Sequence, residues 1–183
     1  IQIGDSTLLT MFGFGLLHGD PNSALKAPYS VVITAEKALK YFGKTDVVGQ
    51  TLSIQNFTGG HREFLITGVL GEIPENSVTN LLGTTDPNSL FISFTTARYF
   101  FDRDVNDWNN IIYPTYLELQ PGVTGADLEK PIQQLIQREG ADFEKENLTV
   151  RPIALQDYHL QKNKALVKRM LFTLSSVGIF ILF

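Results

Sequence analysis

The sequence contains no cysteine, and this absence excludes several kinds of chemistry at once. Without a thiol the chain can form no disulfide, no thiolate nucleophile and no thiolate zinc site. Histidine is also scarce, because only His18, His61 and His159 occur, far apart and in neither the H-x-x-x-H nor the H-E-x-x-H spacing of a zinc site. We interpret them as ordinary surface or packing histidines.

Positive charge is in short supply as well. Lys and Arg number 15 against 19 Asp and Glu, which gives a formal net charge of −4 and a pI near 5.3. Such a chain has no general basic field to hold nucleic acid, so we expect no nucleic-acid partner.

Motifs for nucleotide binding and for serine hydrolysis are missing too. Gly13-x-Gly15 and Gly59-Gly60 lack the strand-to-helix context and the lysine of a phosphate-binding loop, so we interpret both as turns. No serine lies in a G-x-S-x-G elbow. The first residues lack the basic start and small-residue cleavage site of a signal peptide, and we expect the sequence to be cut from a longer chain.

The residues that are present indicate a globular fold with both helices and strands. Hydrophobic residues make up 43% of the chain and charged residues 19%, which is typical of folded rather than disordered proteins. With 183 residues the chain is long enough for one domain or for two small lobes.

The stretch from Pro28 to Leu70 predicts a strand, a helix and two further strands, and the rest of the chain is organised around it. An apolar run at 31–33 precedes a segment in which apolar residues recur at helical spacing, at Ala35, Ala38, Leu39 and Phe42. Thr34 can cap the start of this helix, and Gly43 can take the left-handed conformation that ends it.

Alternating segments predict the two strands that follow. They span 51–55 and 62–70, and a hairpin loop at 56–61 joins them. Further strands are expected at 1–3 and 90–94, and short helices within 8–12 and 95–104.

The second half of the chain predicts a strand, a helix and a strand. The strands are expected at Tyr113–Gln120 and Leu148–Leu155, and a capping box at Thr124–Asp127 starts the helix. The helix has one apolar stripe, formed by Leu128, Ile132, Leu135 and Ile136. Pro131 predicts either a kink or a regular part that starts near Lys130.

The longest uncharged apolar run is the tail Met170–Phe183, which follows the basic residues Lys162, Lys164, Lys168 and Arg169. As a helix it would reach about 21 Å, which is short of a hydrocarbon core of about 30 Å. It is either a buried C-terminal helix or the first part of a truncated transmembrane helix. Its apolar residues cover every face of a helix, which favours the second alternative.

Few side chains are candidates for a functional site. Asp157 and His159 are two residues apart, so in an extended segment they would share a face and could meet a partner. Trp108 could form an aromatic patch with neighbouring aromatic residues, although core packing is the alternative; the neighbours are Tyr99, Phe100 and Phe101. Several carboxylates lie in expected loops, where solvated surface is the ordinary explanation: Glu72, Glu75, Asp86, Asp102, Asp104 and Asp107.

A set of short motifs resembles the MacB-like periplasmic core domain of FtsX-type ABC transporter permeases. The most specific motifs are Tyr41–Gly43, Asp46–Leu52, Ile66–Leu70 and Ile73–Ser77. Weaker similarity occurs at Met11–Asp20 and Pro152–Leu160. Val47, Gln50 and Val78 depart from the usual residues of the family, whereas the glycines and the apolar spacing are kept.

This resemblance implies an α+β, two-lobed periplasmic domain with strand-helix-strand units, followed by the start of a transmembrane helix. By analogy, Ile1–Pro21 and 112–161 form a membrane-proximal lobe, 22–111 form a second, distal lobe, and 162–183 form a basic juxtamembrane stretch and the truncated helix. The domain would face the periplasm from the bacterial inner membrane. It would transmit conformational change and contact substrate or partner proteins without covalent chemistry.

The resemblance also implies partners. They are an ABC ATPase subunit or domain that binds the ATP, a second permease copy, the membrane, and a periplasmic or outer-membrane protein. No cofactor is expected in this chain. Two alternatives remain open: a free-standing extracellular ligand-binding module that uses the aromatic patch near Trp108, and a small hydrolase built on the loop carboxylates.

Overall fold

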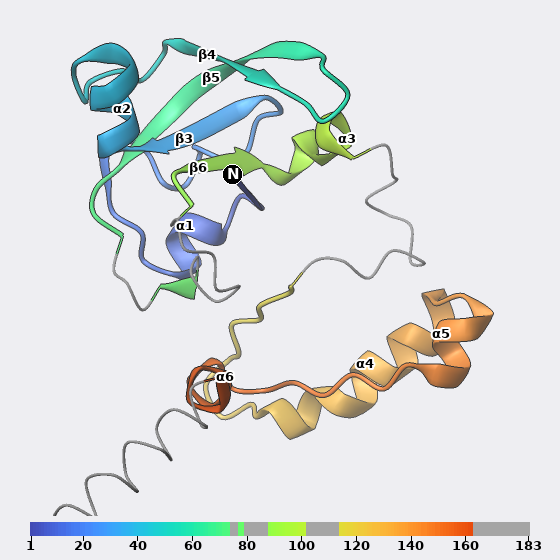
Figure 1. Cartoon of the computed structure of the whole chain (residues 1–183). Coiled ribbons are helices and arrows are strands. Elements are labelled where there is room, and N and C mark those ends of the chain that lie inside the picture. The colour runs from blue at the N-terminus through green and yellow to red at the C-terminus, as the bar shows by residue number, and fades with distance from the viewer. Residues whose placement is uncertain (74–76, 79–87, 102–113, 163–183) are drawn as a thin grey trace, which may run out of the picture. The chain divides into compact units, whose positions relative to one another are not determined.

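The chain folds as two units, Ile1–Asp107 and Trp108–Phe183, and each is considered by itself (Figure 1). The computed structural model describes residues 1–73, 77–78, 88–101 and 114–162, and of residues 159–162 it describes only the backbone. The mixture of a sheet with several helices confirms the predicted α+β class.

Unit 1 is built on a six-stranded mixed sheet with the strand order β1-β6-β3-β5-β2, and β4 pairs with β5 off this path. Strands β3 and β5 are parallel, as are β1 and β6, and the other pairs are antiparallel. The strands are β1 (Gln2–Gly4), β2 (Leu16–Gly19), β3 (Ser30–Thr34), β4 (Thr51–Gln55), β5 (His61–Leu70) and β6 (Leu90–Ser93).

Among the described residues of unit 1, three short helices accompany this sheet, and α2 (Ala35–Phe42) has both predicted caps. The Thr34 hydroxyl accepts a hydrogen bond from the Lys37 backbone N–H at 3.4 Å. Gly43 adopts φ 71° and donates its N–H to the Leu39 carbonyl, so the predicted left-handed end is confirmed. The other helices are α1 (Leu8–Met11) and α3 (Ala97–Phe100), the latter preceded by the 3-10 turn η2 (Phe94–Thr96).

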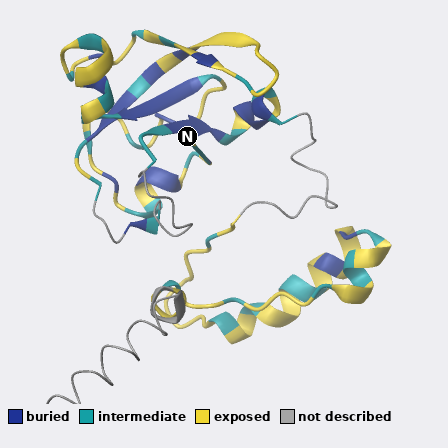
Figure 2. Cartoon of the chain, viewed as in Figure 1, coloured by how far each residue is buried: buried dark blue, intermediate teal, exposed yellow. Residues whose placement is uncertain are grey.

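The sheet of unit 1 buries apolar side chains on both faces, and Figure 2 shows the central strands as the most buried part. One core cluster joins strand residues to α2, α3 and β4; its members are Val31, Ile33, Ala38, Val47, Ile54, Phe64, Ile66, Val69, Ile92 and Phe100. The other joins the strands to α1 and the segment after β2; its members are Leu8, Leu9, Phe14, Ala24, Leu25, Val32, Leu70 and Phe91. Burial on both faces explains why β3 is a continuous apolar run.

Strand β5 contains a bulge at Thr67, where the pairing with β3 skips one residue. The Thr67 hydroxyl lies 2.6 Å from the Ala24 carbonyl and 3.2 Å from the Val31 carbonyl, which ties the segment after β2 to the sheet. Strand β2 approaches this bulge closely, because a Cβ on Gly19 would collide with the Thr67 carbonyl oxygen and would lie 2.9 Å from the Cα of Gly68. Only glycine fits there.

The segment after β2 is held in a turn by the Asp20 carboxylate. It accepts hydrogen bonds from the Asn22 backbone N–H at 3.0 Å, from the Asn22 side-chain amide and from the Ser23 hydroxyl. The backbone and side-chain bonds from Asn22, followed by the bond from Ser23, hold the pKa of Asp20 below its ordinary value. This turn places Ala24 and Leu25 in the core.

In unit 2, the described residues contain α4 (Gly125–Glu139), α5 (Asp142–Asn147) and α6 (Leu155–Lys162). The capping box is confirmed, since the Asp127 carboxylate accepts hydrogen bonds from the Thr124 N–H and hydroxyl. Pro131 lies inside α4, so the helix does not begin near Lys130. The Gln137 amide donates to the Lys145 carbonyl at 2.8 Å and connects α4 to α5.

The strands predicted at Tyr113–Gln120 and Leu148–Leu155 are wrong over the residues that the structure describes. Residues 114–120 and 148–154 are irregular, and Leu155 begins α6. Alternation of apolar residues gives a segment one apolar face. A strand also needs a neighbouring strand to hydrogen-bond its backbone N–H and C=O groups. Within 114–162 no strand is available as that neighbour.

The predicted lobes do not coincide with the two units. The segment Ile1–Pro21 contributes β1 and β2 to the sheet of unit 1, whereas it was grouped with residues 112–161. Which lobe lies near a membrane stays a prediction. Among the helices of the described residues, none is long and apolar enough to cross a membrane, and the tail Met170–Phe183 lies outside those residues.

We expect Gly19→Ala to lower the free energy of unfolding by about 2 kcal/mol or more, because φ is 98° and the new Cβ would meet the Thr67 carbonyl. Gly13→Ala is the matched control. Its φ is also positive at 65°, but nothing lies within 4 Å of its Cβ, so about 1 kcal/mol is expected. Urea unfolding of both variants measures the difference, and equal losses would contradict the close approach of β2 to β5.

A second prediction concerns acid stability. Because the folded-state pKa of Asp20 is lowered, its carboxylate stabilises the fold above the ordinary carboxyl pKa, and this contribution is lost as the pH falls through the folded value. Asp20→Asn should therefore be less stable than the parent chain at pH 7, and the difference should shrink as the pH falls below about 4, the ordinary carboxyl pKa. Urea midpoints at pH 7 and pH 3 test this, and a pH-independent difference would contradict it.

Candidate functional site

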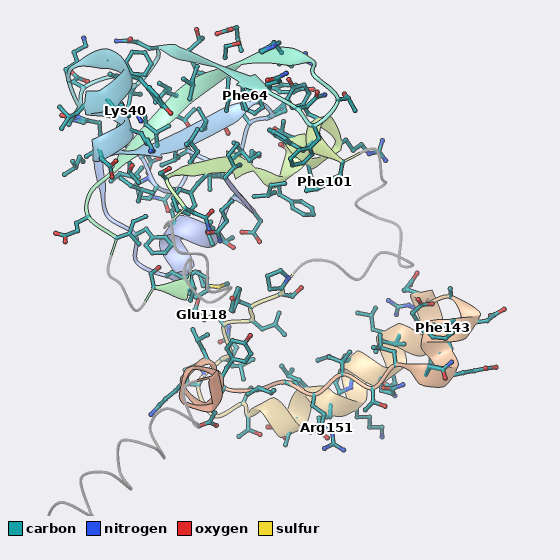
Figure 3. All side chains as sticks on the ribbon, in the orientation of Figure 1. Lys40, Phe64, Phe101, Glu118, Phe143 and Arg151 are labelled. Atoms are coloured by element: carbon teal, nitrogen blue, oxygen red, sulfur yellow. The ribbon has the colours of Figure 1, made fainter. Side chains whose placement is uncertain are left out.

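The most exposed aromatic side chain among the described residues lies at the tip of the β4–β5 hairpin. Phe57 is 77% exposed, although its ring contacts those of Phe100 and Phe101 at centroid distances of 6.1 and 5.7 Å. Phe100 is buried and Phe101 is half-buried, so Phe57 rests on the edge of the core and presents most of its surface to solvent. Figure 3 shows Phe101 at the end of unit 1 opposite to Lys40 of α2.

The conformation of this tip is fixed by the side chain of Asn56. Its carbonyl oxygen accepts hydrogen bonds from the backbone N–H groups of Thr58 and Gly60, at 3.2 and 2.7 Å, and from the Thr58 hydroxyl. Its amide donates to the Tyr99 carbonyl at 3.2 Å. Because Asn56 bonds both to its own turn and to the neighbouring helix α3, the turn has little conformational freedom.

Tyr99 of α3 connects the β4–β5 hairpin to the core through its hydroxyl and its ring. Its hydroxyl lies 2.8 Å from the Ile54 carbonyl and 2.6 Å from the Gly60 carbonyl, one on each arm of the hairpin. Its ring packs edge-on against Phe100 at 5.0 Å and lies 5.7 Å from Phe64. The base of the hairpin is therefore part of the core, while its tip is surface.

Among the described residues, both basic and acidic side chains lie in the hairpin and on α3. The Arg62 guanidinium lies 3.8 Å from the centre of the Tyr29 ring and donates to the Tyr29 hydroxyl at 2.9 Å. Arg98 on α3 is exposed, as is His61 at the start of β5. Glu63 is the acidic residue of the hairpin 51–70. We define the tip site as Asn56, Phe57, Arg62, Arg98 and Tyr99.

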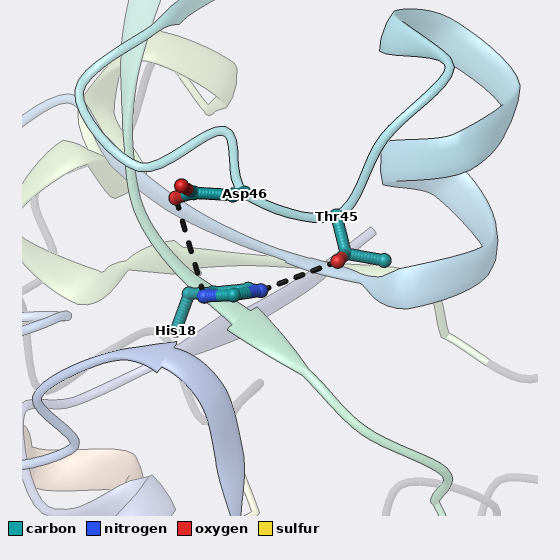
Figure 4. Close-up of polar contacts among 3 residues, drawn as sticks. All are labelled: His18, Thr45 and Asp46. Carbon is teal, nitrogen blue, oxygen red and sulfur yellow. Dashed lines mark hydrogen bonds and ion pairs between the residues drawn. The ribbon is translucent and has the colours of Figure 1, made fainter.

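A second polar cluster lies where β2 meets the loop after α2 (Figure 4). The His18 ring nitrogens lie 3.2 Å from the Thr45 hydroxyl and 4.0 Å from the Asp46 carboxylate. Asp46 itself is mostly exposed, so the ion pair contributes little. We interpret this cluster as a local support for the loop.

That loop contains the motif Asp46–Leu52, and the structure shows why the motif has a glycine at position 49. Gly49 adopts φ 88° and donates to the Ile66 carbonyl, while the Ile66 N–H donates to the Gln50 carbonyl, both at 2.8 Å. Val47 is buried in the core. The motif therefore fills the edge of β5 between β4 and β2, which is a structural role.

The segment of the predicted partner contacts Asp157 and His159 is helical and not extended. Asp157 is exposed in the first turn of α6, and the backbone of His159 belongs to the same helix. Their role as partner contacts stays a prediction. Trp108 lies outside the described residues, and its proposed neighbours Phe100, Tyr99 and Phe101 pack in or against the core.

The structure describes one of the six loop carboxylates named for the hydrolase alternative. Glu72 is exposed, and the other five candidates lie outside the described residues. Within the described residues, no three His, Asp or Glu side chains are grouped as metal ligands would be.

Sequence reasoning missed Phe57, because the loop 56–61 was treated only as a hairpin turn. A signal was available, since an aromatic residue amid Asn, Thr and two Gly residues has no strand or helix face on which to be buried.

Comparison with known proteins identifies a family. A family model described as "MacB-like periplasmic core domain" matches residues 1–135. A solved structure titled as a domain of a "putative Permease protein" from Porphyromonas gingivalis is 25% identical to this chain, with a TM-score of 0.54. The match covers 78% of this chain and 54% of that structure, so the chain spans about half of its length. No curated protein matches.

The matched range includes the strands described in unit 1 and the most specific motifs of the resemblance, from Tyr41 to Ser77. It covers more than half of the sequence. The chain therefore belongs to the MacB-like periplasmic core domain family.

Proposed function

We propose that this chain is the extracytoplasmic domain of an ABC transporter permease, which faces the periplasm from the bacterial inner membrane. The family match over residues 1–135 is the observation that carries this proposal, and the similarity to a permease domain supports it. The domain transmits conformational change and contacts substrate or partner proteins, without covalent chemistry of its own.

The construction of unit 1 suits a body that moves as a whole. Strand β5 is bonded to β2, β3 and β4, and both faces of the sheet are covered by apolar clusters. Well-packed interiors have low compressibility and pass on displacement instead of absorbing it. The exposed tip site is then the place where such displacement meets another molecule.

Other components complete the proposed transporter. ATP binds to a separate ATPase subunit or domain. A second permease copy and a periplasmic or outer-membrane protein are the further partners. The segment 162–183 provides the connection to the membrane.

The absence of cysteine permits a direct test of location. Ser53→Cys introduces one thiol on the exposed face of β4 in the full-length protein. A membrane-impermeant maleimide should label it in intact spheroplasts and should fail to label it in sealed inside-out vesicles. Ser93→Cys, the same change at a fully buried position, should stay unlabelled in both. Labelling of Ser53→Cys only from the cytoplasmic side would overturn the proposal.

Transmission of movement predicts a second labelling result. Thr115→Cys places a thiol on the exposed, irregular segment 114–120, whereas Ser53→Cys lies within the sheet. Trapping the ATPase partner with vanadate in native membranes should change the labelling rate at Thr115→Cys several-fold and leave the rate at Ser53→Cys within about twofold. Equal rates with and without vanadate at Thr115→Cys would argue against transmission through this segment.

A further inference from the structure

We propose that Phe57 is the anchor by which this domain holds a separate, soluble partner protein, by inserting its ring into an apolar pocket with an acidic rim. This inference rests on the proposed function, because it assigns the partner contact to a particular side chain. Three observations carry it: the exposure of the ring, the rigidity of the tip, and the charge around it.

The exposure of Phe57 is not a consequence of a loose loop. The hydrogen bonds of Asn56 and Tyr99 hold the turn on both arms, and the ring rests against Phe100 and Phe101. A side chain that is already ordered loses little conformational entropy on binding. Aromatic residues presented in this way are typical of the few residues that supply most of the binding energy at interfaces.

The size of the tip argues against a second copy of this chain as the occupant. One aromatic side chain buries about 150–250 Å², whereas a stable interface needs about 800 Å² from each partner. The neighbours of Phe57 at the tip are Thr58 and two glycines, which add little apolar surface. A small, rigid anchor of this kind suits a contact that forms and breaks during a transport cycle.

The same neighbours argue against a lipid bilayer. Insertion of Phe57 into hydrocarbon would take the polar turn 58–60 with it, and unpaired backbone groups there cost several kcal/mol each. Membrane-bound surfaces instead present a broad apolar face. A protein pocket can receive a single ring and leave the turn in water.

The charge around the tip indicates what surrounds that pocket. Arg62 is held in place by the Tyr29 ring and hydroxyl, Arg98 is exposed one turn before Phe101, and Glu63 is the acidic residue of the hairpin. A basic surround favours an acidic rim on the partner, which steers the encounter and speeds association. The partner is therefore recognised by an apolar pocket bordered by Asp or Glu.

A photo-crosslinker at Thr58 tests the proposal in the full-length protein in living cells. We expect p-benzoylphenylalanine at this exposed position to capture one soluble protein, which mass spectrometry identifies together with the crosslinked residues. Those residues should border an apolar pocket with acidic side chains at its rim. The same crosslinker at Lys40, on the opposite end of unit 1, should not capture it.

Variants of the anchor provide the quantitative readout. Phe57→Ala should lower the yield of the Thr58 crosslink about tenfold or more, and Phe57→Trp should keep most of it. Tyr41→Ala removes another exposed aromatic side chain, on α2, and should leave the yield unchanged. Because Phe57 is 77% exposed, its alanine variant should unfold at nearly the parent temperature.

Several outcomes would overturn this inference. They are an unchanged yield with Phe57→Ala, a crosslink only to a second copy of the chain or to lipid, a captured surface without an acidic apolar pocket, and no crosslink at all. If Ser53→Cys is labelled from outside while any of these occurs, the assignment of Phe57 fails and the proposed function stands. Labelling of Ser53→Cys only from the cytoplasm would remove the proposed function itself.

Discussion

The pairing of β5 with its neighbours is the constraint on which the structure of unit 1 depends. One side of this strand pairs with β3 from Leu65 to Leu70, and β4 and β2 bond to its two ends. Residues 49–50 bond to Ile66 between those two strands. The helix α2, the hairpin tip and the turn at Asp20 all take their places from segments attached to this one strand.

The bulge at Thr67 changes which residues of β5 face each core cluster. Before it, Phe64 and Ile66 face the cluster that contains α2 and α3; after it, Val69 faces that cluster and Leu70 faces the other. The extra residue, Thr67, also stabilises the fold, because its hydroxyl donates a hydrogen bond to the Ala24 carbonyl in the segment that covers the second core cluster. Gly19 is needed where β2 packs against the backbone of this irregular part of the strand.

The sequence predicted those parts of the fold that local signals determine. Helix α2 is confirmed because Thr34 and Gly43 fix its two ends, and the β4–β5 hairpin is confirmed because alternation and a Gly-Gly turn lie next to each other. The pairing of β1 with β6 could not be predicted, since it joins residues about 90 positions apart and leaves no local signal. The strand predicted at Tyr113–Gln120 is wrong although its apolar residues alternate as in a strand, because a strand forms only beside another strand.

The candidate site was less predictable than the fold. Trp108 and its aromatic neighbours were suggested by their density in the sequence, yet Phe100 is used in the core. Whether an aromatic ring is buried depends on what lies above it, and that is a tertiary property. Phe57 became visible only when the hydrogen bonds of Asn56 and Tyr99 showed that its turn is ordered and its ring is not covered.

The sharing of one edge of β5 has a consequence for how this domain can change in evolution. Strand β4, residues 49–50 and β2 follow one another along that edge, so an extra residue between Gly43 and Thr51 would push a neighbour out of register. Insertions and deletions should therefore be rejected in this segment. They should collect where the chain leaves the sheet, at the exposed hairpin turn 57–60, where an added residue disturbs no strand pairing.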